Sequence, residues 1–549
     1  MNGKKVSSQK QYVVKAIHLL LRQVGLTPEL RAARRIRKNM RHYTDKAESN
    51  QLGAERILIA TMRDWAVHVQ FEALLGHLLK IEGAEVKHLT CGGGLTVCDR
   101  VNTWEGPPMP CNSCTKYVRS SLKAHGSKYS ALSTDWGESN WPELDNMSLE
   151  ELTKVEYNGF KLGFIVDIPV KWFLLRETLS EDPIAVSTYR SFLRSARVIL
   201  VSAEKAIDEF LPTQVLLLNG LLLFESIIWE ICRSRGIPVV TYERAFILDT
   251  FVFSRKEAAG YYRFDEAWSD SRKIELTQAE DEELENYLAD RQLGLRASDD
   301  YWKEVSYTGV SSNGLGRRAV LFTNIVWDAA VLRQDIAFPS IVDWIVEAIE
   351  QFRKRPNDEL IIRVHPAETK LLGRESREEM EFVLRARVAK MPQNVVIIPS
   401  SDPRSSYQLM QQADFGLVYS STAGLEMVLA GKPVIVAAQT HYRSKGFTID
   451  VESPGEFIAA LNHLLVDSLS MSPDIVLARR YAYLFFFKAA FANMGVTEPI
   501  RGLVKFTSDN PAKLLECGSK DLKRFISGMK SNGKFIASTS SPTGNRLNE

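Results

Sequence analysis

Residues 419–436 read YSSTAGLEMVLAGKPVIV, and the order of residue types predicts a strand, a turn, a short helix and another strand. An apolar run from Phe415 predicts the first strand, and the three hydroxyl residues after it are types that favour a helix N-terminus. A glycine and a proline end the helix predicted over 423–430, and 433–438 predicts the next strand. A short helix between two such strands is typical of a parallel α/β sheet.

The same alternation extends through the C-terminal part of the chain. Strands are predicted at 319–324, 359–365, 394–400, 414–420 and 433–438. Besides the short helix already described, helices are predicted at 338–353, 373–390 and 405–413. Five strands with helices between them predict a doubly wound, Rossmann-like sheet.

The N-terminal half carries a second βαβ pattern, which begins near Arg56. At 549 residues the chain is too long for one ordinary core, so we expect two such domains. We place the linker between them in the acidic and polar stretch 271–316. The expected parts are a basic arm (1–50), an N-terminal Rossmann-like domain (51–310), a C-terminal Rossmann-like domain (317–475), a final apolar helix (476–500) and a disordered tail (505–549).

The composition is that of a soluble globular protein, with 45% hydrophobic and 25% charged residues. The formal net charge of +2 does not indicate a nucleic-acid partner. Residues 1–43, however, are rich in Lys and Arg and contain one acid, Glu29, so they predict either a solvated arm or a helix on a membrane surface. No apolar run is long enough to span a bilayer and no signal peptide is recognisable, so we expect a cytoplasmic protein. If the basic helix contacts a membrane, we expect that contact at the inner membrane face.

Four of the six cysteines fall within the loop 91–114, as Cys91, Cys98, Cys111 and Cys114. In a cytosolic protein such clustering favours metal binding over disulfides, and four thiolates would fill the tetrahedral shell of a structural zinc. Free or redox-paired thiols are the alternative interpretation.

Polar side chains follow the strands predicted in the C-terminal domain. They are Asn324 and Asp328 after the first strand, Arg363, His365 and Glu368 after the second, and Ser420, Ser421, Thr422 and Glu426 after the fourth. Because the carboxyl ends of parallel strands meet at one edge of a sheet, we expect these groups to form a nucleotide site. The hydroxyl groups at a helix start favour phosphate, a basic side chain adds charge, and a carboxylate suits ribose hydroxyls.

Each of these residues also has a purely structural interpretation, as a helix cap or a core side chain. Glu426 is an exception, because a capping box would need Ser or Thr three residues earlier and residue 423 is Ala. The chain contains no G-x-x-x-x-G-K-[ST] phosphate loop and no G-x-G-x-x-G motif. It also contains no Asp-x-Asp, so a metal-bridged diphosphate is not expected.

Four stretches together resemble the capsule polysaccharide biosynthesis proteins: LFTNIVWDAAV (321–331), IIRVHPAE (361–368), the opening stretch, and HYRSKGFTID (441–450). That family is similar to Kdo transferases of the GT-B fold. The resemblance implies two Rossmann-like domains facing across a cleft, with residues 476–500 as a crossover helix. It also implies a CMP- or UDP-linked sugar donor bound by the C-terminal domain and a glycan or glycolipid acceptor bound by the N-terminal domain.

The predicted function is therefore a metal-independent glycosyltransferase, and such a reaction needs a base for the acceptor hydroxyl. Glu243 is the first candidate, followed by Asp64 and His68 after the first strand. Kdo transferases carry Glu-Asp-Gly-Phe at the strand end where this chain has Glu243, Arg244 and Ala245, so the second carboxylate is missing and Kdo is in doubt as the donor. The alternatives are a sugar-nucleotide epimerase of the same architecture and a non-catalytic capsule-assembly protein.

Overall fold

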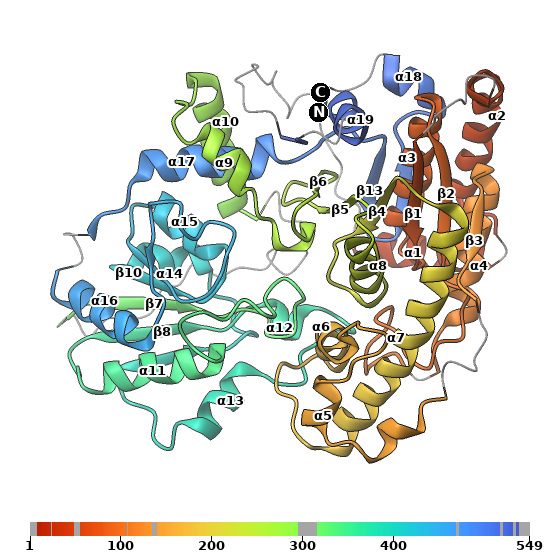
Figure 1. Ribbon diagram of the computed structural model, residues 1–549. Helices are drawn as coiled ribbons and strands as arrows, with labels where there is room; N and C mark the ends of the chain where they lie inside the picture. The colour runs from red at the N-terminus through yellow and green to blue at the C-terminus, as the bar shows by residue number, and fades with distance from the viewer. Residues whose placement is uncertain are drawn as a thin grey trace.

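The computed structural model describes residues 8–23, 25–48, 55–106, 108–133, 140–294, 316–467, 471–516, 520–530 and 534–536. These residues form two α/β domains, each built on a six-stranded sheet. In Figure 1 the N-terminal domain, red to yellow, lies beside the C-terminal domain, green to cyan. The predicted pair of Rossmann-like domains is confirmed.

The N-terminal sheet has the strand order β3-β2-β1-β4-β5-β6, in which β1 to β5 are parallel and β6 is antiparallel to β5. Its strands are β1 (Arg56–Thr61), β2 (Glu85–Thr90), β3 (Tyr129–Ala131), β4 (Gln214–Leu218), β5 (Val239–Arg244) and β6 (Phe251–Ser254). In this order the chain reverses between β1 and β4, where ligands bind in open α/β sheets.

Helices cover both faces of this sheet. They are α3 (Ala66–Ile81), α4 (Cys111–His125), α5 (Leu149–Thr153), α6 (Leu162–Leu174), α7 (Pro183–Phe210) and α8 (Leu223–Ser234). The apolar sides of α6, α7 and α8 pack on one face, and those of α3 and α4 pack on the other. The long helix α7 begins at Asp182, whose carboxylate accepts hydrogen bonds from the backbone of Ile184 and Ala185.

The C-terminal sheet is parallel throughout and has the order β12-β11-β10-β7-β8-β9. Its strands are β7 (Arg318–Phe322), β8 (Glu359–Arg363), β9 (Val395–Ile398), β10 (Phe415–Val418), β11 (Val434–Val436) and β12 (Ile449–Asp450). Its helices are α11 (Ile341–Arg353), α12 (Ala367–Lys370), α13 (Met380–Arg387), α14 (Ser406–Gln412), α15 (Ala423–Leu429) and α16 (Pro454–Val466). All five predicted strands are present. The helix predicted over 373–390 is not continuous, because 371–379 is irregular and α13 begins after it.

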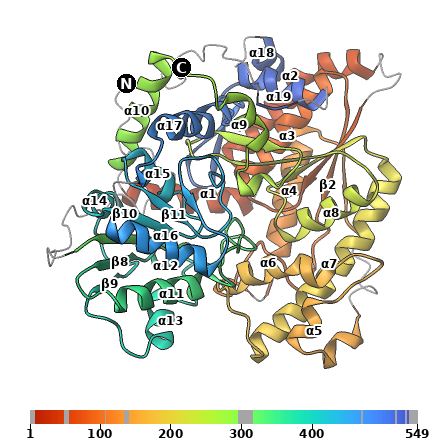
Figure 2. The ribbon, with the colours of Figure 1, turned by 60° about the vertical axis from the view of Figure 1, so that its left-hand side comes forward.

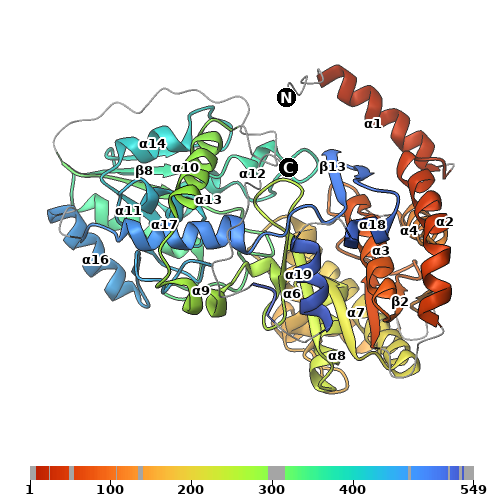
Figure 3. The ribbon, with the colours of Figure 1, turned by 90° about the horizontal axis from the view of Figure 1, so that it is seen from above.

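The crossover is confirmed, although the helix is shorter than predicted. Helix α17 (Ile475–Tyr483) continues into a π-helical turn, Leu484–Lys488. The chain then reaches the N-terminal domain, where Phe491 and Phe251 exchange backbone hydrogen bonds of 2.7 and 3.0 Å. Figure 3 shows α17 on the side of the C-terminal domain and the following chain beside the N-terminal domain.

The tail predicted to be disordered is folded where the structure describes it. After the hairpin of β13 (Val496–Ile500) and β14 (Leu503–Phe506), the chain forms α18 (Pro511–Glu516) and α19 (Lys520–Lys530). Leu522, Phe525 and Met529 of α19 are buried in the core of the N-terminal domain. The prediction was wrong because the polar composition conceals apolar residues at helical spacing, which form one buried stripe. Residues 517–519, 531–533 and 537–549 lie outside the described part.

The boundary between the domains also differs from the predicted one. Helices α9 (Asp265–Ser271) and α10 (Gln278–Gln292) fall within the predicted N-terminal domain and linker. Their residues Trp268, Leu284 and Tyr287 instead pack with the core of the C-terminal domain. The chain therefore changes domain near residue 262.

The basic arm is helical in its described part, as α1 (Ser8–Gln23) and α2 (Pro28–Glu48). Leu30, Ala33, Ile36 and Met40 of α2 are buried, and α2 packs against α3 and α4. In Figure 3, α1 extends beyond the body of the domain. Within the described part of the chain, none of the helices combines the length and hydropathy that a membrane span requires.

Candidate functional site

The two domains meet through the segments that follow the carboxyl ends of their strands. Asn102 Nδ2 of the N-terminal domain donates to the carbonyl of Gly373, at 2.8 Å. The apolar side chains at this junction form one cluster, with Leu221 and Leu222 on one side and Ala329 and Leu332 on the other. In Figure 2, α6 lies on the side of the N-terminal domain that faces the C-terminal domain. This junction therefore contains the strand-end residues predicted to bind ligand.

His365 is held in a defined orientation after β8. Its backbone N–H donates to Thr323 Oγ1 (3.0 Å), and its ring Nδ1 accepts from the backbone N–H of Ala367 (3.2 Å). Burial, with a smaller effect from the charge of Arg363, lowers the pKa of His365 to about 4. The imidazole is therefore neutral at pH 7, and this hydrogen bond assigns its proton to Nε2, which can donate to an anionic oxygen.

The hydroxyl residues after β10 lie next to the same turn. The backbone N–H of Ser420 donates to Asn324 Oδ1 (3.4 Å), so the neighbours Thr323 and Asn324 hold His365 and Ser420 respectively. Ser420 Oγ is buried and has no hydrogen-bond partner among the described residues. A buried hydroxyl without a partner is costly, so this atom favours a ligand oxygen at the site. Ser421 Oγ accepts from the backbone of Ala423, and the Thr422 side chain makes no cap hydrogen bond at the start of α15.

The carboxylate of Glu426, on α15, forms an ion pair. Its Oε1 accepts from Arg291 Nε at 2.7 Å, and the two side chains are 10% and 20% exposed. The guanidinium of Arg291 also lies over the rings of Phe246 (5.8 Å) and Phe486 (5.6 Å). Glu426 thus joins α15 to α10 and to the crossover segment. This pairing gives no support to the predicted hydrogen bonds with ribose.

Arg363 and Glu368 also have structural partners. Arg363 is 2% exposed, and its guanidinium donates to the carbonyls of Pro399 (2.7 Å) and Asp402 (3.1 Å). Glu368 Oε1 accepts from the backbone N–H of Met380 (2.9 Å) at the start of α13, and burial raises its pKa to about 7. The two side chains stabilise the loops after β8 and β9, and these bonds do not support the predicted contacts with the nucleotide.

Glu243 and Asp328 bring two carboxylates to the junction from opposite domains. Glu243 Oε1 accepts from the backbone N–H of Arg244 (2.7 Å), and Asn219 provides a further hydrogen bond. Asp328 Oδ1 accepts from the backbone N–H of Ala330 (3.0 Å). Burial raises the pKa of Glu243 to about 7, and the charge of Asp328 contributes to the rise. Glu243 is therefore poised to take a proton near neutral pH.

The other two candidate bases are less suitable. Asp64 is ion-paired with both Arg22 (2.6 Å) and Arg100, so its carboxylate oxygens are already occupied by two guanidinium groups. His68 Nδ1 lies 3.2 Å from the hydroxyl of Tyr242, and burial lowers its pKa to about 3. The structure places both residues near the end of β1, where they hold α1 and β5 in position.

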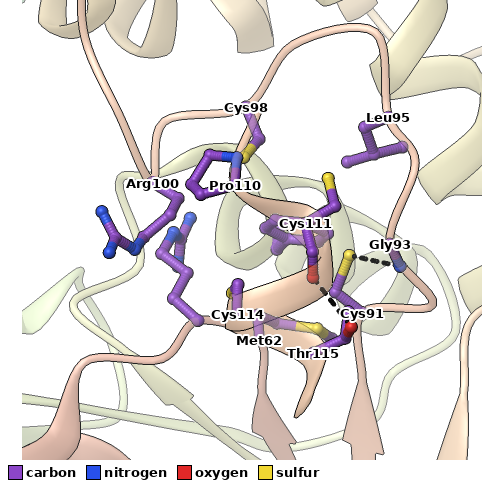
Figure 4. A pocket seen from close by; sticks show the side chains of 12 residues that line it. Met62, Cys91, Gly93, Leu95, Cys98, Arg100, Pro110, Cys111, Cys114 and Thr115 are labelled. Carbon is purple, nitrogen blue, oxygen red and sulfur yellow. Dashed lines mark hydrogen bonds between the residues drawn. The ribbon is translucent and has the colours of Figure 1, made fainter. Parts of the chain in front are cut away.

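The four cysteines of loop 91–114 line one pocket together with Arg63 and Arg100 (Figure 4). Burial raises the pKa of Cys91 to about 11 and that of Cys114 to about 12, so these thiols are protonated at pH 7. Among the described residues, no group of three or more His, Cys, Asp or Glu side chains could hold a metal ion. The four side chains line one pocket without forming a ligand shell, so the described structure does not support the predicted zinc site. The described cysteines form no disulfide.

Two arginines at the junction were not predicted from the sequence. Arg291 lies 135 positions before its partner Glu426, so no local pattern could connect them. Arg374 follows His365 by nine positions, in the irregular segment that lies between the domains. The only local indication of Arg374 in the sequence is that it is a basic residue soon after a histidine at a strand end.

Comparison with known proteins connects this site to a family. Residues 262–460 match the family described as "Capsule polysaccharide biosynthesis protein". The matched segment begins where the chain changes domain and includes β7 to β12. A search of the curated proteins finds no match.

Solved structures with similar architecture include two from Thermosulfurimonas dismutans KpsC. The β Kdo 2,4 transferase is 14% identical, with 55% of this chain and 87% of that chain covered and a TM-score of 0.34. The β Kdo 2,7 transferase is 13% identical, with coverages of 58% and 89% and a TM-score of 0.33. A UDP-GlcNAc 2-epimerase from Neisseria meningitidis is 13% identical, with coverages of 78% and 97% and a TM-score of 0.26. The chain contains two Rossmann-like domains, and its residues 262–460 match the capsule polysaccharide biosynthesis family.

Proposed function

We propose that this protein is a glycosyltransferase that moves a sugar from a nucleotide donor to a capsular or other surface glycan or glycolipid. The observation that carries the proposal is the arrangement of His365 and Ser420 on the adjacent residues Thr323 and Asn324. The turn after β8 contributes a neutral imidazole, and the turn after β10 contributes a buried hydroxyl that has no partner in the described structure. The family match over residues 262–460 supports the same conclusion.

In this proposal the donor phosphate lies at the C-terminal domain. His365 Nε2–H, the Ser420 hydroxyl and the backbone N–H groups at the start of α15 stabilise the charge that develops on the nucleotide leaving group. These donors are preorganised, because their own hydrogen bonds hold them before substrate arrives. The sequence contains no Asp-x-Asp to bridge a metal to the diphosphate, so the proposed reaction is metal-independent. A CMP- or UDP-linked sugar is the proposed donor.

Glu243 is the proposed general base. Its pKa of about 7 lets it accept the proton of an acceptor hydroxyl near neutral pH, and its backbone and Asn219 contacts fix its orientation. Asp328 stands opposite on the C-terminal domain, where its charge raises the pKa of the base. The base is therefore placed between the domain proposed to bind acceptor and the domain proposed to bind donor.

Nucleotide affinity tests this assignment directly. Calorimetric titration with CMP, UDP and GDP is expected to find one nucleotide that binds the wild-type protein. Ser420→Ala and His365→Ala should each weaken that binding by about tenfold, the loss expected when one hydrogen bond to a charged group is removed. His463→Ala on α16, outside the junction, is the control and should leave affinity unchanged. Unaltered affinity in both site variants would overturn the proposed donor site.

We also propose that the N-terminal arm places the enzyme at an anionic membrane, where a lipid-linked acceptor would be found. Val14, Ile17 and Leu20 are 37%, 52% and 65% exposed on the protruding helix α1. Exposed basic residues follow on α2: Arg31, Arg34, Arg35, Arg37 and Lys38. Each contributes about 1 kcal/mol near an anionic lipid surface, and the apolar side chains add shallow insertion.

Sedimentation with vesicles of phosphatidylglycerol and phosphatidylcholine tests the arm. The variant Ile17→Ser/Leu20→Ser keeps the buried residues of α2 and should bind vesicles several-fold more weakly than the wild type. Raising salt from 0.05 to 0.5 M should weaken wild-type binding as well, since salt screens charges on a surface. Binding that is equal for both proteins and insensitive to salt would contradict this placement.

A further inference from the structure

Arg374 is fixed at the centre of the domain junction by contacts on both sides. The carbonyl of Gly373 accepts from Asn102 Nδ2 (2.8 Å), and the carbonyl of Glu375 accepts from Trp104 Nε1 (3.0 Å). The backbone around Arg374 is therefore tied to the loop after β2 in the N-terminal domain. Its guanidinium carbon lies 5.1 Å from the centre of the Trp172 ring, which itself packs edge-on against Trp327 at 5.3 Å. The side chain is held, half-buried, against this pair of rings.

The guanidinium of Arg374 makes no hydrogen bond or ion pair with any described residue. Other arginines in similar surroundings are paired: Arg63 contacts Asp99 and Glu225, and Arg291 contacts Glu426. Removal of a charge from water is unfavourable unless a partner replaces the lost hydration. The half-buried guanidinium of Arg374 therefore has N–H groups that no described residue fills, although the charges of Glu105 and Asp328 act on it.

Charges of both signs surround Arg374. Burial lowers the pKa of Arg374 to about 10; the charges of Arg501 and Arg100 add to this decrease, and those of Glu105 and Asp328 oppose it. Arg501 is exposed in the turn between β13 and β14 and has no partner in the described structure, whereas Arg100 pairs with Asp64 and Glu105. The neighbouring charges thus balance, and Arg501 is the neighbouring cation that no carboxylate pairs with in the described structure.

We infer that Arg374, supported by Arg501, forms a subsite for an anionic group, a phosphate or a carboxylate, carried by the glycan or glycolipid acceptor. The contacts that orient Arg374 come from Asn102, Trp104 and Trp172, all in the N-terminal domain. The nucleotide candidates His365 and Ser420 instead belong to the C-terminal domain. A planar guanidinium held on an aromatic face presents two parallel N–H groups to such an oxyanion.

This inference rests on the proposed function, because it treats the N-terminal domain as the acceptor side. The charge of Asp328 acts on both Arg374 and Glu243, so the subsite and the proposed base share one electrostatic neighbour. An acceptor anchored at Arg374 by its anionic group would therefore bring a hydroxyl group near Glu243. The subsite thus selects acidic acceptors and positions them for transfer.

Ligand-observed NMR with two matched pairs of probes tests the subsite: glucuronate against glucose, and sn-glycerol 3-phosphate against glycerol. The wild-type protein should bind at least one anion at least tenfold more tightly than its neutral counterpart. Arg374→Gln should remove that preference, and Arg374→Lys should keep part of it, because the charge remains without the planar fork. A preference for glucuronate identifies a carboxylate, and a preference for glycerol phosphate identifies a phosphate.

Arg377→Gln is the matched control, because Arg377 lies in the same segment and stacks at 3.2 Å on Trp104, at the exposed rim. It should bind the anions as the wild type does. Equal anion binding by wild type and Arg374→Gln, or equal binding of anions and neutral probes by the wild type, overturns the inference.

Nucleotide titrations of the same proteins separate the two proposals. If no nucleotide binds the wild type, the donor site fails while anion binding still stands. If Arg374→Gln weakens nucleotide and anion binding alike, the anion belongs to the donor and the acceptor assignment is wrong.

Discussion

Single side chains at the junction acquire their properties from partners that are distant in the sequence. Glu243 has an ordinary carboxyl group, yet burial and the facing charge of Asp328 raise its pKa to about 7. Glu426 has no capping role. Arg291 of α10 instead forms an ion pair with it, and the pair joins α10 to α15. The chemistry of each residue is therefore determined by packing between elements that are distant in the sequence.

The raised pKa of Glu243 predicts the pH dependence of transfer. A base must be deprotonated to act, so kcat/KM should fall tenfold per pH unit below about 7. Asp328→Asn removes a negative charge and should move this limb of the profile to lower pH. Glu243→Gln should lower kcat/KM by about 10² to 10⁴ and abolish the limb. A limb that stays in place in Asp328→Asn would show that the two carboxylates are not coupled.

The Arg291–Glu426 pair predicts a large stability effect that depends on which partner is lost. Arg291→Ala leaves a mostly buried carboxylate without its guanidinium and should lower the free energy of unfolding by about 3 kcal/mol. The double variant Arg291→Met/Glu426→Gln removes both charges and should recover much of that loss. Denaturant unfolding measures both changes. Equal destabilisation of the single and double variants would mean that the packing of Arg291 on Phe246 and Phe486 matters more than its charge.

Among the elements, β2, α3 and α4 share an unusual buried cluster of histidines. His77, His88 and His125 are at most 4% exposed, and His77 Nε2 lies 3.2 Å from His125 Nδ1. Burial lowers the pKa of His88 and of His125 to about 3, and it lowers that of His77 as well. The cluster is therefore neutral in the folded protein across the physiological range.

This cluster predicts that the protein loses stability in mild acid. Between pH 6.5 and about 3 the unfolded chain binds protons at these histidines while the folded chain does not, so stability is complete above pH 6.5 and falls as the pH is lowered. Each histidine should contribute about 1.4 kcal/mol per pH unit in this window. Denaturant unfolding at pH 7.0 and 5.5 measures the loss, and His125→Gln should reduce it. A variant as acid-sensitive as the wild type would contradict this origin.

The sequence predicts the regular elements better than the contacts between them. Alternation of apolar strands and amphipathic helices is enough to predict β7 to β11, because each strand falls within an apolar run bounded by turn or helix signals. β12, with two residues, and β3, with three, lie in no such run. The polar residues after β8 and β10 are expected near one another because a parallel sheet brings its strand ends to one edge. The Arg291–Glu426 pair depends on helices that are distant in the sequence, and the Arg374–Trp172 contact depends on the packing of the two domains. No local pattern contains either of them.

At the scale of the whole molecule, the N-terminal domain is assembled from both ends of the chain. Residues up to about 262 form its sheet, and β13, β14, α18 and α19 return to cover it after the crossover. Phe525 of α19 is fully buried and its ring lies 4.7 Å from that of Phe253 on β6. The last helix is therefore part of the core of the first domain.

Phe525→Ala should accordingly destabilise the N-terminal domain. Truncation of a fully buried aromatic side chain leaves a cavity and costs about 3–5 kcal/mol. Lys523→Ala, on the exposed side of the same helix, should change stability by less than about 0.5 kcal/mol. Thermal or denaturant unfolding compares the two. Similar stability of both variants would mean that α19 contributes little to the domain.

The return of the chain from one domain to the other also sets an order of events during synthesis. About 270 residues separate Phe253 from α19, the helix that covers it, so α19 leaves the ribosome that many residues later. At 5–20 residues per second this interval lasts roughly 14–54 s. Throughout that time the C-terminal domain can complete its own sheet, while the N-terminal one exposes an aromatic face that a nascent-chain chaperone could occupy. The first domain to begin translation is thus the second to finish folding.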